Sequence, residues 1–425
     1  MKSNPPVSRA KPALLHRLGI IVAVLVLTLL IGSMVFVLNL AHRQATATVR
    51  SSLTSVHTAS SQVGVYVGSA DGAIYRLNAA NGQLTWRYKT RGRSIAAPAT
   101  VDNSIVYAGS LDGSVYALNA TDGKLIWQYQ TNGAILSSPR AANGVVYVGS
   151  SDGYEYALNA KTGTPIWKYY TGPGTSAVVA RTVVVIQNVV YGSSYDDVAH
   201  SYLYALDASN GSQLWRIQVA NQNFTDPQVV SGVIYIASWA IKQEGGPDIR
   251  DSYVYAFNAA NGSQIWRSDK VGDFILFAPT VDNGVVYAGS RDAFVYAMDA
   301  RTGKRLWRYN TGGTIYTSPS VANGVVYVGV MGAVLANTTS NTTDTTQADG
   351  YIIAVDAAKG SLIWQHSLPN YAGTTLTVFD SVIYVGSEDN MVYALTIKDG
   401  STIWHYQDKV GVAVKDGNAP ITVAP

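Results

Sequence analysis

The sequence predicts an all-β fold, an eight-bladed β-propeller of four-stranded antiparallel blades, preceded by one transmembrane helix. A unit of about 40 residues recurs eight times, which indicates stacked supersecondary units. Each unit alternates apolar and polar residues with period two between Asn-Gly or Asp-Gly turns, as short antiparallel strands do. The composition agrees, because charged residues make up only 13% while Gly (39) and Tyr (28) are plentiful.

The transmembrane helix is predicted over residues 18–40, where no charged residue occurs. A helix of this length reaches about 34 Å and can cross a hydrocarbon core of about 30 Å. By the positive-inside rule the N-terminus is cytoplasmic. The basic residues that precede the segment are Lys2, Arg9, Lys11 and Arg17, and only Arg43 and Arg50 closely follow it.

We therefore expect a single-pass protein of the cell membrane. Residues 1–17 form a cytoplasmic basic tail, 18–40 a signal anchor, 41–62 a Ser/Thr/Ala-rich linker and 63–425 an extracytoplasmic propeller. The alternative is a cleaved signal peptide, because Ala45-Thr46-Ala47 has the small-x-small form of a cleavage site. A sensor that signals through the helix is disfavoured, because residues 1–17 are too few for a signalling domain.

Charge and cysteine content exclude several classes. The chain has no cysteine, which excludes disulfides, thiolate metal sites and a lipidated cysteine. Beyond residue 50 there are 24 basic and 27 acidic residues, so the globular part is slightly acidic. No nucleic-acid partner is expected of such a surface.

Eight of the nine tryptophans form one series, one to a unit, and four residues before each of them stands a glycine that suits a tight turn of positive φ. We predict a structural role for both. The tryptophans are Trp86, Trp127, Trp167, Trp215, Trp266, Trp307, Trp364 and Trp404. The glycines are Gly82, Gly123, Gly163, Gly211, Gly262, Gly303, Gly360 and Gly400.

Four strands are predicted in each unit. In the second unit they are an Ala-Pro strand near Pro98, then residues 105–110, 115–119 and 124–130. The first unit lacks an Ala-Pro strand, and residues 419–423 match the one in the second unit. We therefore expect the C-terminal strand 419–423 to close the ring, which leaves no open sheet edge.

Three units are longer than the rest, with insertions between the second and third strands at residues 193–201, 238–252 and 332–350. Insertions on one face of a repeat protein often bind partners. The second insertion predicts a partner-binding face through Trp239, Lys242, Glu244, Asp248 and Arg250, with packing of Trp239 in its own loop as the alternative. The third reads as a solvated loop with sequons at Asn337 and Asn341.

The search for catalytic residues is negative. Residues 149–153 match G-x-S-x-G, but they lie in a strand–turn–strand context and are expected to form a hairpin turn. The histidines of the propeller, His200, His366 and His405, are scattered and predict no metal site. Two carboxylates, Asp226 and Asp273, are expected in loops that open onto the central channel, with solvated loop charge as their default role.

The run Ala117 to Trp127, ALNATDGKLIW, resembles the tryptophan-docking motif of the pyrroloquinoline quinone (PQQ)-like β-propeller family, and eight such runs cover residues 63–425. The resemblance implies a girdle in which each Trp packs against a neighbouring motif. It also implies one of two functions. The chain is more similar to the non-enzymatic branch that includes the propeller lipoprotein of the outer-membrane assembly machine, which implies a non-catalytic scaffold for a protein or other envelope ligand.

The alternative that the resemblance implies is a PQQ-dependent dehydrogenase or a PQQ-binding protein. Those enzymes hold PQQ and calcium through a Glu/Asn/Asp set and cap the cofactor with a disulfide. This chain lacks cysteine and no segment matches the ligand set, so no cofactor is expected, although PQQ with calcium stays open as the alternative. Asp226 and Asp273 are the carboxylates that such an activity would use.

Overall fold

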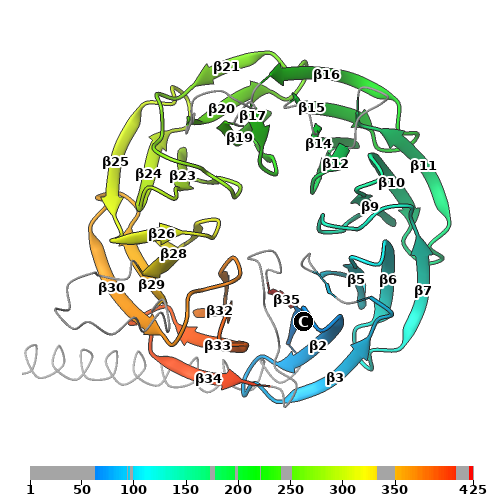
Figure 1. Cartoon of the computed structure of the whole chain (residues 1–425), viewed down its shortest axis with the longest axis horizontal. Coiled ribbons are helices and arrows are strands. Elements are labelled where there is room, and N and C mark those ends of the chain that lie inside the picture. Colours follow the sequence, from blue (N-terminus) through cyan, green and yellow to red (C-terminus); the bar gives the residue numbers. More distant parts are fainter. Residues whose placement is uncertain are drawn as a thin grey trace, which may run out of the picture. The chain divides into compact units, whose positions relative to one another are not determined.

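The computed structural model describes residues 63–92, 94–95, 99–172, 178–196, 200–220, 222–240, 251–332, 350–407 and 421–424. Over these residues, 35 strands form eight antiparallel sheets around a central opening (Figure 1). The predicted eight-bladed propeller is therefore confirmed. In this part of the chain no helix is long and apolar enough to cross a membrane, and the helix predicted over residues 18–40 lies outside it.

The strands of the first four blades follow chain order, except that the last strand of the chain joins blade one. They are β1 (Gly64–Gly68), β2 (Ala73–Asn78), β3 (Leu84–Lys89) and β35 (Thr422–Ala424); β4 (Thr100–Asp102), β5 (Ile105–Gly109), β6 (Ser114–Asn119) and β7 (Leu125–Gln130); β8 (Arg140–Ala142), β9 (Val145–Gly149), β10 (Tyr154–Asn159) and β11 (Pro165–Tyr170); β12 (Val178–Ala180), β13 (Val184–Ile186), β14 (Val189–Asp196), β15 (His200–Asp207) and β16 (Gln213–Ala220).

The other four blades repeat this arrangement. Their strands are β17 (Gln222–Phe224), β18 (Gln228–Val230), β19 (Val233–Ala240), β20 (Ser252–Asn258) and β21 (Gln264–Arg267); β22 (Thr280–Asp282), β23 (Val285–Gly289), β24 (Phe294–Asp299) and β25 (Arg305–Asn310); β26 (Gly313–Ile315), β27 (Ser320–Ala322), β28 (Val325–Gly332), β29 (Gly350–Asp356) and β30 (Leu362–Leu368); β31 (Thr377–Phe379), β32 (Val382–Ser387), β33 (Met391–Thr396) and β34 (Thr402–Tyr406).

Each blade has four strand positions, as predicted. In three blades the innermost position is divided in two, because β12 and β13 both pair with β14, β17 and β18 with β19, and β26 and β27 with β28. In blade two the innermost strand begins at Thr100 rather than at Pro98, which lies outside the described residues.

The core lies between neighbouring blades. Tyr107 and Val115 of blade two, for example, pack with Val146, Tyr156 and Leu158 of blade three, and all five are buried. Period-two strands bury both faces here, because each blade is covered by a neighbour on either side. Eight blades thus share their cores around the ring.

The tryptophans of the outermost strands fasten each blade to the next. Every indole Nε1–H donates to a backbone carbonyl of the following blade at 2.9–3.0 Å. Trp127, for example, donates to Ala160, and its ring covers Gly163, whose φ is +71°. The residue that accepts this bond thus lies seven positions before the tryptophan of the following blade. The alanine that lies ten positions before a tryptophan has another place: Ala117, for example, pairs with Trp127 within its own blade.

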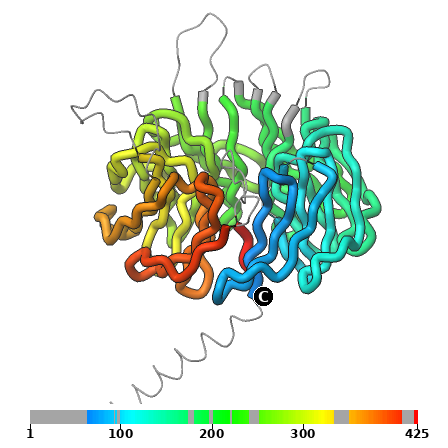
Figure 2. Tube along the Cα trace, turned by 60° about the horizontal axis from the view of Figure 1, so that its bottom comes forward, coloured from blue at the N-terminus to red at the C-terminus, as the bar shows by residue number. Residues whose placement is uncertain are grey.

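The C-terminal strand completes blade one. Thr422 pairs with Tyr66 and Ala424 with Gly64, so β35 lies beside β1 as the innermost strand (Figure 2). The Thr422 hydroxyl donates to the Ala99 carbonyl of blade two, and the Thr377 hydroxyl of blade eight donates to the Ile421 carbonyl. The paired segment is 422–424 rather than the expected 419–423, because in both blades the strand follows the Ala-Pro pair rather than containing it.

The strands that flank the three insertions are longer than their counterparts in the other blades. In blade four, Tyr195 pairs with Ser201 and Ser194 with Tyr202, so most of residues 193–201 lengthens β14 and β15 instead of forming a loop. In the other two long blades, β19 runs to Ala240 and β28 to Gly332. The extended ends point to one side of the propeller, at the top of Figure 2. We call this side the insertion-bearing face.

Candidate functional site

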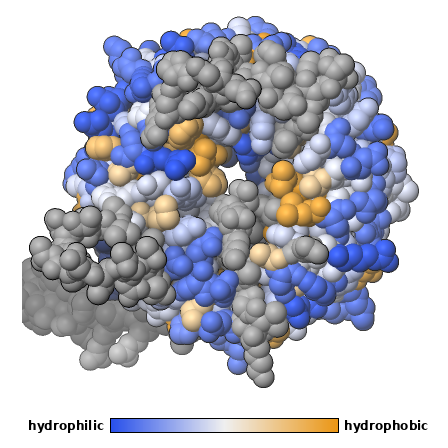
Figure 3. Space-filling model, viewed as in Figure 1, coloured by the Kyte–Doolittle hydropathy of each residue, from blue (hydrophilic) through white to orange (hydrophobic). Residues whose placement is uncertain are grey.

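A cavity of about 870 Å³ lies in the central channel and is lined by side chains from six of the eight blades, three to eight. We call it the channel-mouth cavity, because Trp239 and Met331, which line it, stand at the extended ends of β19 and β28 on the insertion-bearing face. Figure 3 shows that face, with apolar residues around the central opening. The volume suits a ligand or a few side chains of a partner.

Arg181 and two aromatic rings form one wall of this cavity. The Arg181 guanidinium carbon lies 5.1 Å from the ring centre of Tyr195 and 5.3 Å from that of Trp239, within cation–π range. The two rings meet edge-on at 6.4 Å. Arg181 follows β12 in blade four and Trp239 belongs to β19 in blade five, so the wall bridges two blades.

Hydrogen bonds between inner loops hold this wall in place. The Ser138 backbone N–H donates to the Thr182 hydroxyl (3.0 Å), and the Thr182 N–H donates to Oδ1 of Asp226 (3.3 Å). The Arg181 N–H donates to the Ser193 carbonyl (2.9 Å). Blades three, four and five are thereby joined at the channel.

The part of the lining that blades six to eight contribute is apolar and aromatic. Leu276 and Phe277 of blade six, Tyr316 and Met331 of blade seven and Tyr371 of blade eight belong to it. Tyr316 and Tyr371 lie 6.2 Å apart, an aromatic pair across neighbouring blades. The charged residues of the lining are Arg140, Arg181 and Asp226, which gives the cavity a net positive charge.

Of the predicted site residues that the structure describes, some line the channel-mouth cavity and one does not. Trp239 lies in β19 rather than in a loop and packs on the preceding blade, and Asp226 lines the cavity. Asp273 does not line it, and its carboxylate accepts the N–H of Phe274 (2.9 Å). Lys242, Glu244, Asp248, Arg250, Asn337 and Asn341 lie outside the described residues. Sequence reasoning missed Arg181, which no motif marks.

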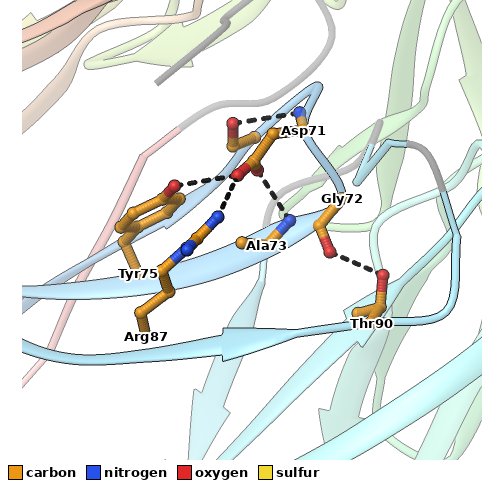
Figure 4. A network of polar contacts seen from close by, with 7 residues as sticks. Asp71, Gly72, Ala73, Tyr75, Arg87 and Thr90 are labelled. Carbon is orange, nitrogen blue, oxygen red and sulfur yellow. Dashed lines mark hydrogen bonds and ion pairs between the residues drawn. The ribbon is translucent and has the colours of Figure 1, made fainter. Parts of the chain in front are cut away.

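Polar clusters also stand in the turns between second and third strands, where their role is structural. In blade one, Asp71 accepts from the Tyr75 hydroxyl (3.0 Å), from Arg87 (2.6 Å) and from the Ala73 N–H (2.8 Å) (Figure 4). Burial alone would raise the pKa of Asp71, but the bonds from Arg87 and its neighbours lower it. Four other blades repeat the Asp–Tyr bond.

The remaining motifs have no catalytic geometry. Residues 149–153 connect β9 to β10 by a turn in which the Gly153 N–H donates to the Ser150 carbonyl (3.1 Å). His200, His366 and His405 belong to three different strands. Across the described residues, no three His, Cys, Asp or Glu side chains are close enough to hold a metal ion.

Three stretches of the chain, residues 70–200, 250–341 and 329–423, match the model of the family described as outer membrane protein assembly factor BamB. They cover more than half of the sequence. The chain belongs to the BamB family. The predicted resemblance to PQQ-repeat propellers is thus confirmed.

Solved structures share the fold of this BamB family member at low identity. BamB from Moraxella catarrhalis superposes with a TM-score of 0.59 at 20% identity, over 76% of this chain and 88% of that one. The quinohemoprotein alcohol dehydrogenase from Comamonas testosteroni gives 0.60 at 14% identity, over 81% and 69%. The computationally designed protein Ika8 gives 0.62 at 18% identity, over 79% and 93%. No curated protein matches the sequence.

The channel-mouth cavity of this BamB family member does not fit PQQ with calcium. A single carboxylate, Asp226, lines it, and its Oδ1 already accepts the Thr182 N–H. Calcium takes six to eight oxygen ligands, usually with several carboxylates. The described lining therefore lacks the donor set for that ion, although Arg181 and Trp239 could contact an anionic aromatic molecule.

Proposed function

We propose that this protein is a non-catalytic binding module of the cell envelope, tethered to the cell membrane by residues 18–40 and facing away from the cytoplasm. It binds a protein or another envelope ligand on its insertion-bearing face. The observation that carries this proposal is the channel-mouth cavity, where Arg181, Tyr195 and Trp239 form a polar and aromatic wall between two lengthened blades. Aromatic and Arg side chains that are half-buried in this way are typical of binding hot spots.

Affinity capture tests the binding face. The full-length chain, its Trp239→Ala variant and a variant that lacks residues 241–250 are used to capture proteins from envelope extracts. Deletion within 241–250 spares the paired residues of β19 and β20. We expect a partner that the unaltered chain retains and both variants lose. Leu306→Ala, at an exposed site on the outer strand β25, is the matched control and should keep the partner. Equal recovery by all four proteins would contradict the proposed face.

The membrane tether is tested by single-cysteine labelling, which the absence of native cysteine makes unambiguous. In intact cells a membrane-impermeant thiol reagent should label a Ser60→Cys variant and leave a Ser3→Cys variant unlabelled. The mass of the mature chain then distinguishes a retained anchor from cleavage after Ala47. Labelling of the Ser3→Cys variant in intact cells would overturn the proposed orientation.

A PQQ-binding function is the second candidate, favoured by the shared fold with quinohemoprotein alcohol dehydrogenase and by the aromatic cavity in the channel. Calorimetric titration of the full-length chain with PQQ and calcium tests it. The donor set predicts no calcium-dependent binding. Saturable binding that requires calcium would instead assign a cofactor to the cavity.

A further inference from the structure

We propose that Asn143 and Asn323 are sites of spontaneous deamidation, at which the chain converts an Asn-Gly pair into isoaspartyl-Gly. Each pair forms the turn between the first and second full strands of its blade, between β8 and β9 in blade three and between β27 and β28 in blade seven. We call residues 143–144 and 323–324 the inner turns. This chemistry does not depend on the proposed binding function.

The reaction needs only water as a co-reactant. The backbone nitrogen of the glycine attacks Cγ of the asparagine, so that the N–Cγ bond of a succinimide forms and the Cγ–Nδ2 bond breaks. The amide group leaves as ammonia and takes the glycine N–H proton with it. Water then opens the succinimide at either carbonyl, which yields aspartate or isoaspartate. Glycine favours the attack, because it has no Cβ to crowd the nitrogen.

Three of the seven Asn-Gly pairs of the chain are protected by hydrogen bonds. They lie between the third and fourth strands of blades one, four and five, at residues 81–82, 210–211 and 261–262, and we call them the docking turns. In each, the glycine N–H donates to a carbonyl at 2.8 Å, and the asparagine Oδ1 accepts the N–H of the residue after the glycine at 2.8–3.0 Å. A Cβ on any of these glycines would stand 2.6–2.7 Å from a tryptophan ring. Both reacting groups are therefore engaged, and the turn has no room to rearrange.

The inner turns leave both reacting groups free. Among the residues that the structure describes, neither glycine N–H has an acceptor and neither asparagine side chain has a partner. A Cβ built on Gly144 or Gly324 meets nothing within 4 Å. Both turns have the two positive φ angles of type I′, 52° and 78° in one and 52° and 74° in the other. Exposure does not separate the two classes, because the docking-turn asparagines are exposed as well.

The two remaining pairs are restrained in other ways. The side-chain amide of Asn283 donates to the Asp282 carboxylate at 2.9 Å, which ties the group that must rotate. Gly133 lies against the next blade, where a Cβ would stand 2.3 Å from the Asp152 nitrogen, and the Asn132 N–H donates to the Asp152 carboxylate at 3.0 Å. We expect both pairs to react more slowly than the inner turns.

Isoaspartate at an inner turn should loosen the docking of a tryptophan. The Gly144 carbonyl accepts the Ala160 N–H at 2.9 Å, and the Ala160 carbonyl in turn accepts the Trp127 indole N–H at 2.9 Å. Blade seven repeats this chain of bonds. Isoaspartate lengthens the main chain by one methylene group and so displaces the glycine carbonyl. Deamidation therefore reaches the contacts of blade two with blade three and of blade six with blade seven.

Peptide mapping by mass spectrometry tests the proposal on the full-length chain, stored in detergent at neutral to mildly alkaline pH. We expect the inner-turn asparagines to deamidate about tenfold faster than the docking-turn asparagines, because two hydrogen bonds must open first in the docking turns. In urea, where the turns are lost, the rates should converge. Isoaspartyl methyltransferase, which methylates isoaspartate but not aspartate, should label the inner-turn peptides. Equal rates in the folded chain, a difference that persists in urea, or no reaction at the inner turns while the unfolded chain reacts would overturn the proposal.

A double variant, Asn143→Gly with Asn323→Gly, tests the effect on docking. Gly-Gly suits a type I′ turn, so the fold should be kept while the reacting side chains are removed. On storage the parent should lose melting temperature, followed by tryptophan fluorescence, and the double variant should keep it. Asn261→Gly, which removes a docking-turn pair, is the matched control and should age as the parent does. Loss in the double variant at the rate of the parent would overturn the link between the inner turns and docking.

Discussion

Glu155 is a carboxylate in an apolar core. Its strand, β10, matches the third strand of every other blade, and the corresponding seven residues are aliphatic and fully buried: Ile74, Val115, Leu203, Val254, Val295, Ile352 and Val392. Glu155 is likewise 0% exposed. One of its oxygens accepts the Tyr204 hydroxyl at 3.3 Å across the interface of blades three and four, and the other has no partner among the described residues.

We predict that this residue makes the propeller less stable at higher pH. Burial raises the pKa of Glu155 well above 4.5, although the bond from Tyr204 lowers it in part. The folded state thus keeps its proton at pH values where the unfolded state has released it. Stability from this group is complete below the unfolded pKa and is lost as the pH rises through the folded pKa.

Denaturant unfolding of the full-length chain from about pH 5 to about pH 9 measures this effect. The range begins just above the unfolded pKa of about 4.5 and extends upward, in the direction in which burial shifts the folded pKa. Glu155→Val, which installs the aliphatic residue of the other blades, should add about 1–3 kcal/mol at the upper pH. Glu155→Gln, which keeps the shape but cannot titrate, should also reduce the slope. An unchanged slope in both variants would show that Glu155 is not the titrating group.

Gly163 lies against the Trp127 ring of the preceding blade, and Gly144, which has no such neighbour, provides a control. Both Gly163 (φ +71°) and Gly144 (φ +78°) have positive φ, so alanine at either site is strained by about 1–2 kcal/mol. A Cβ at Gly163 would stand 2.6 Å from the Trp127 ring, whereas one at Gly144 meets nothing within 4 Å. We expect Gly163→Ala to cost about 1–3 kcal/mol more than Gly144→Ala in urea unfolding. Equal costs would contradict the docking role.

At the scale of elements, the closing strand is the one whose removal should matter most. Ile421, which precedes β35, is only 2% exposed and packs with Val65 of blade one and Trp404 of blade eight in the core between these blades. Removal of residues 418–425 takes away this contact, the pairing with β1 and the inner-strand bonds to both neighbours.

We therefore predict that the truncated chain melts at a clearly lower temperature, followed by circular dichroism. Ile421→Ala, which keeps the backbone, should cost about 2–5 kcal/mol. Removal of Pro425 alone is the control and should change little. If the truncated and intact chains melt alike, β35 does not close the ring energetically.

At the scale of the whole molecule, the ring should unfold in one step. Each blade contacts two neighbours, and β35 removes the free blade interface at which unfolding of an open array begins. Tryptophans stand in every blade, so their fluorescence reports on the full ring. We expect fluorescence and far-UV circular dichroism to give coincident urea transitions. Two separated transitions would contradict a closed, cooperative ring.

Prediction succeeded for the ring and reached only two residues of the cavity lining, Trp239 and Asp226. The Trp and Gly series and the match between residues 97–101 and 419–423 are local patterns with a fixed spacing, so they could be read along the chain. Trp239 was singled out as an isolated tryptophan, but its partners Arg181 and Tyr195 come from another blade. Glu155 occupies the position that is aliphatic in the other seven repeats, and no motif of the sequence marks it.

The sequence by itself determined the number of blades, the strands within each blade and the residues that fasten one blade to the next. Those features follow from period-two patterning and turn residues, which act over a few residues of chain. Only the tertiary structure decided which inner loops meet in the channel. Closing the ring brings Arg140, Arg181, Asp226 and Trp239 to one cavity, and no local pattern encodes how loops from different blades converge.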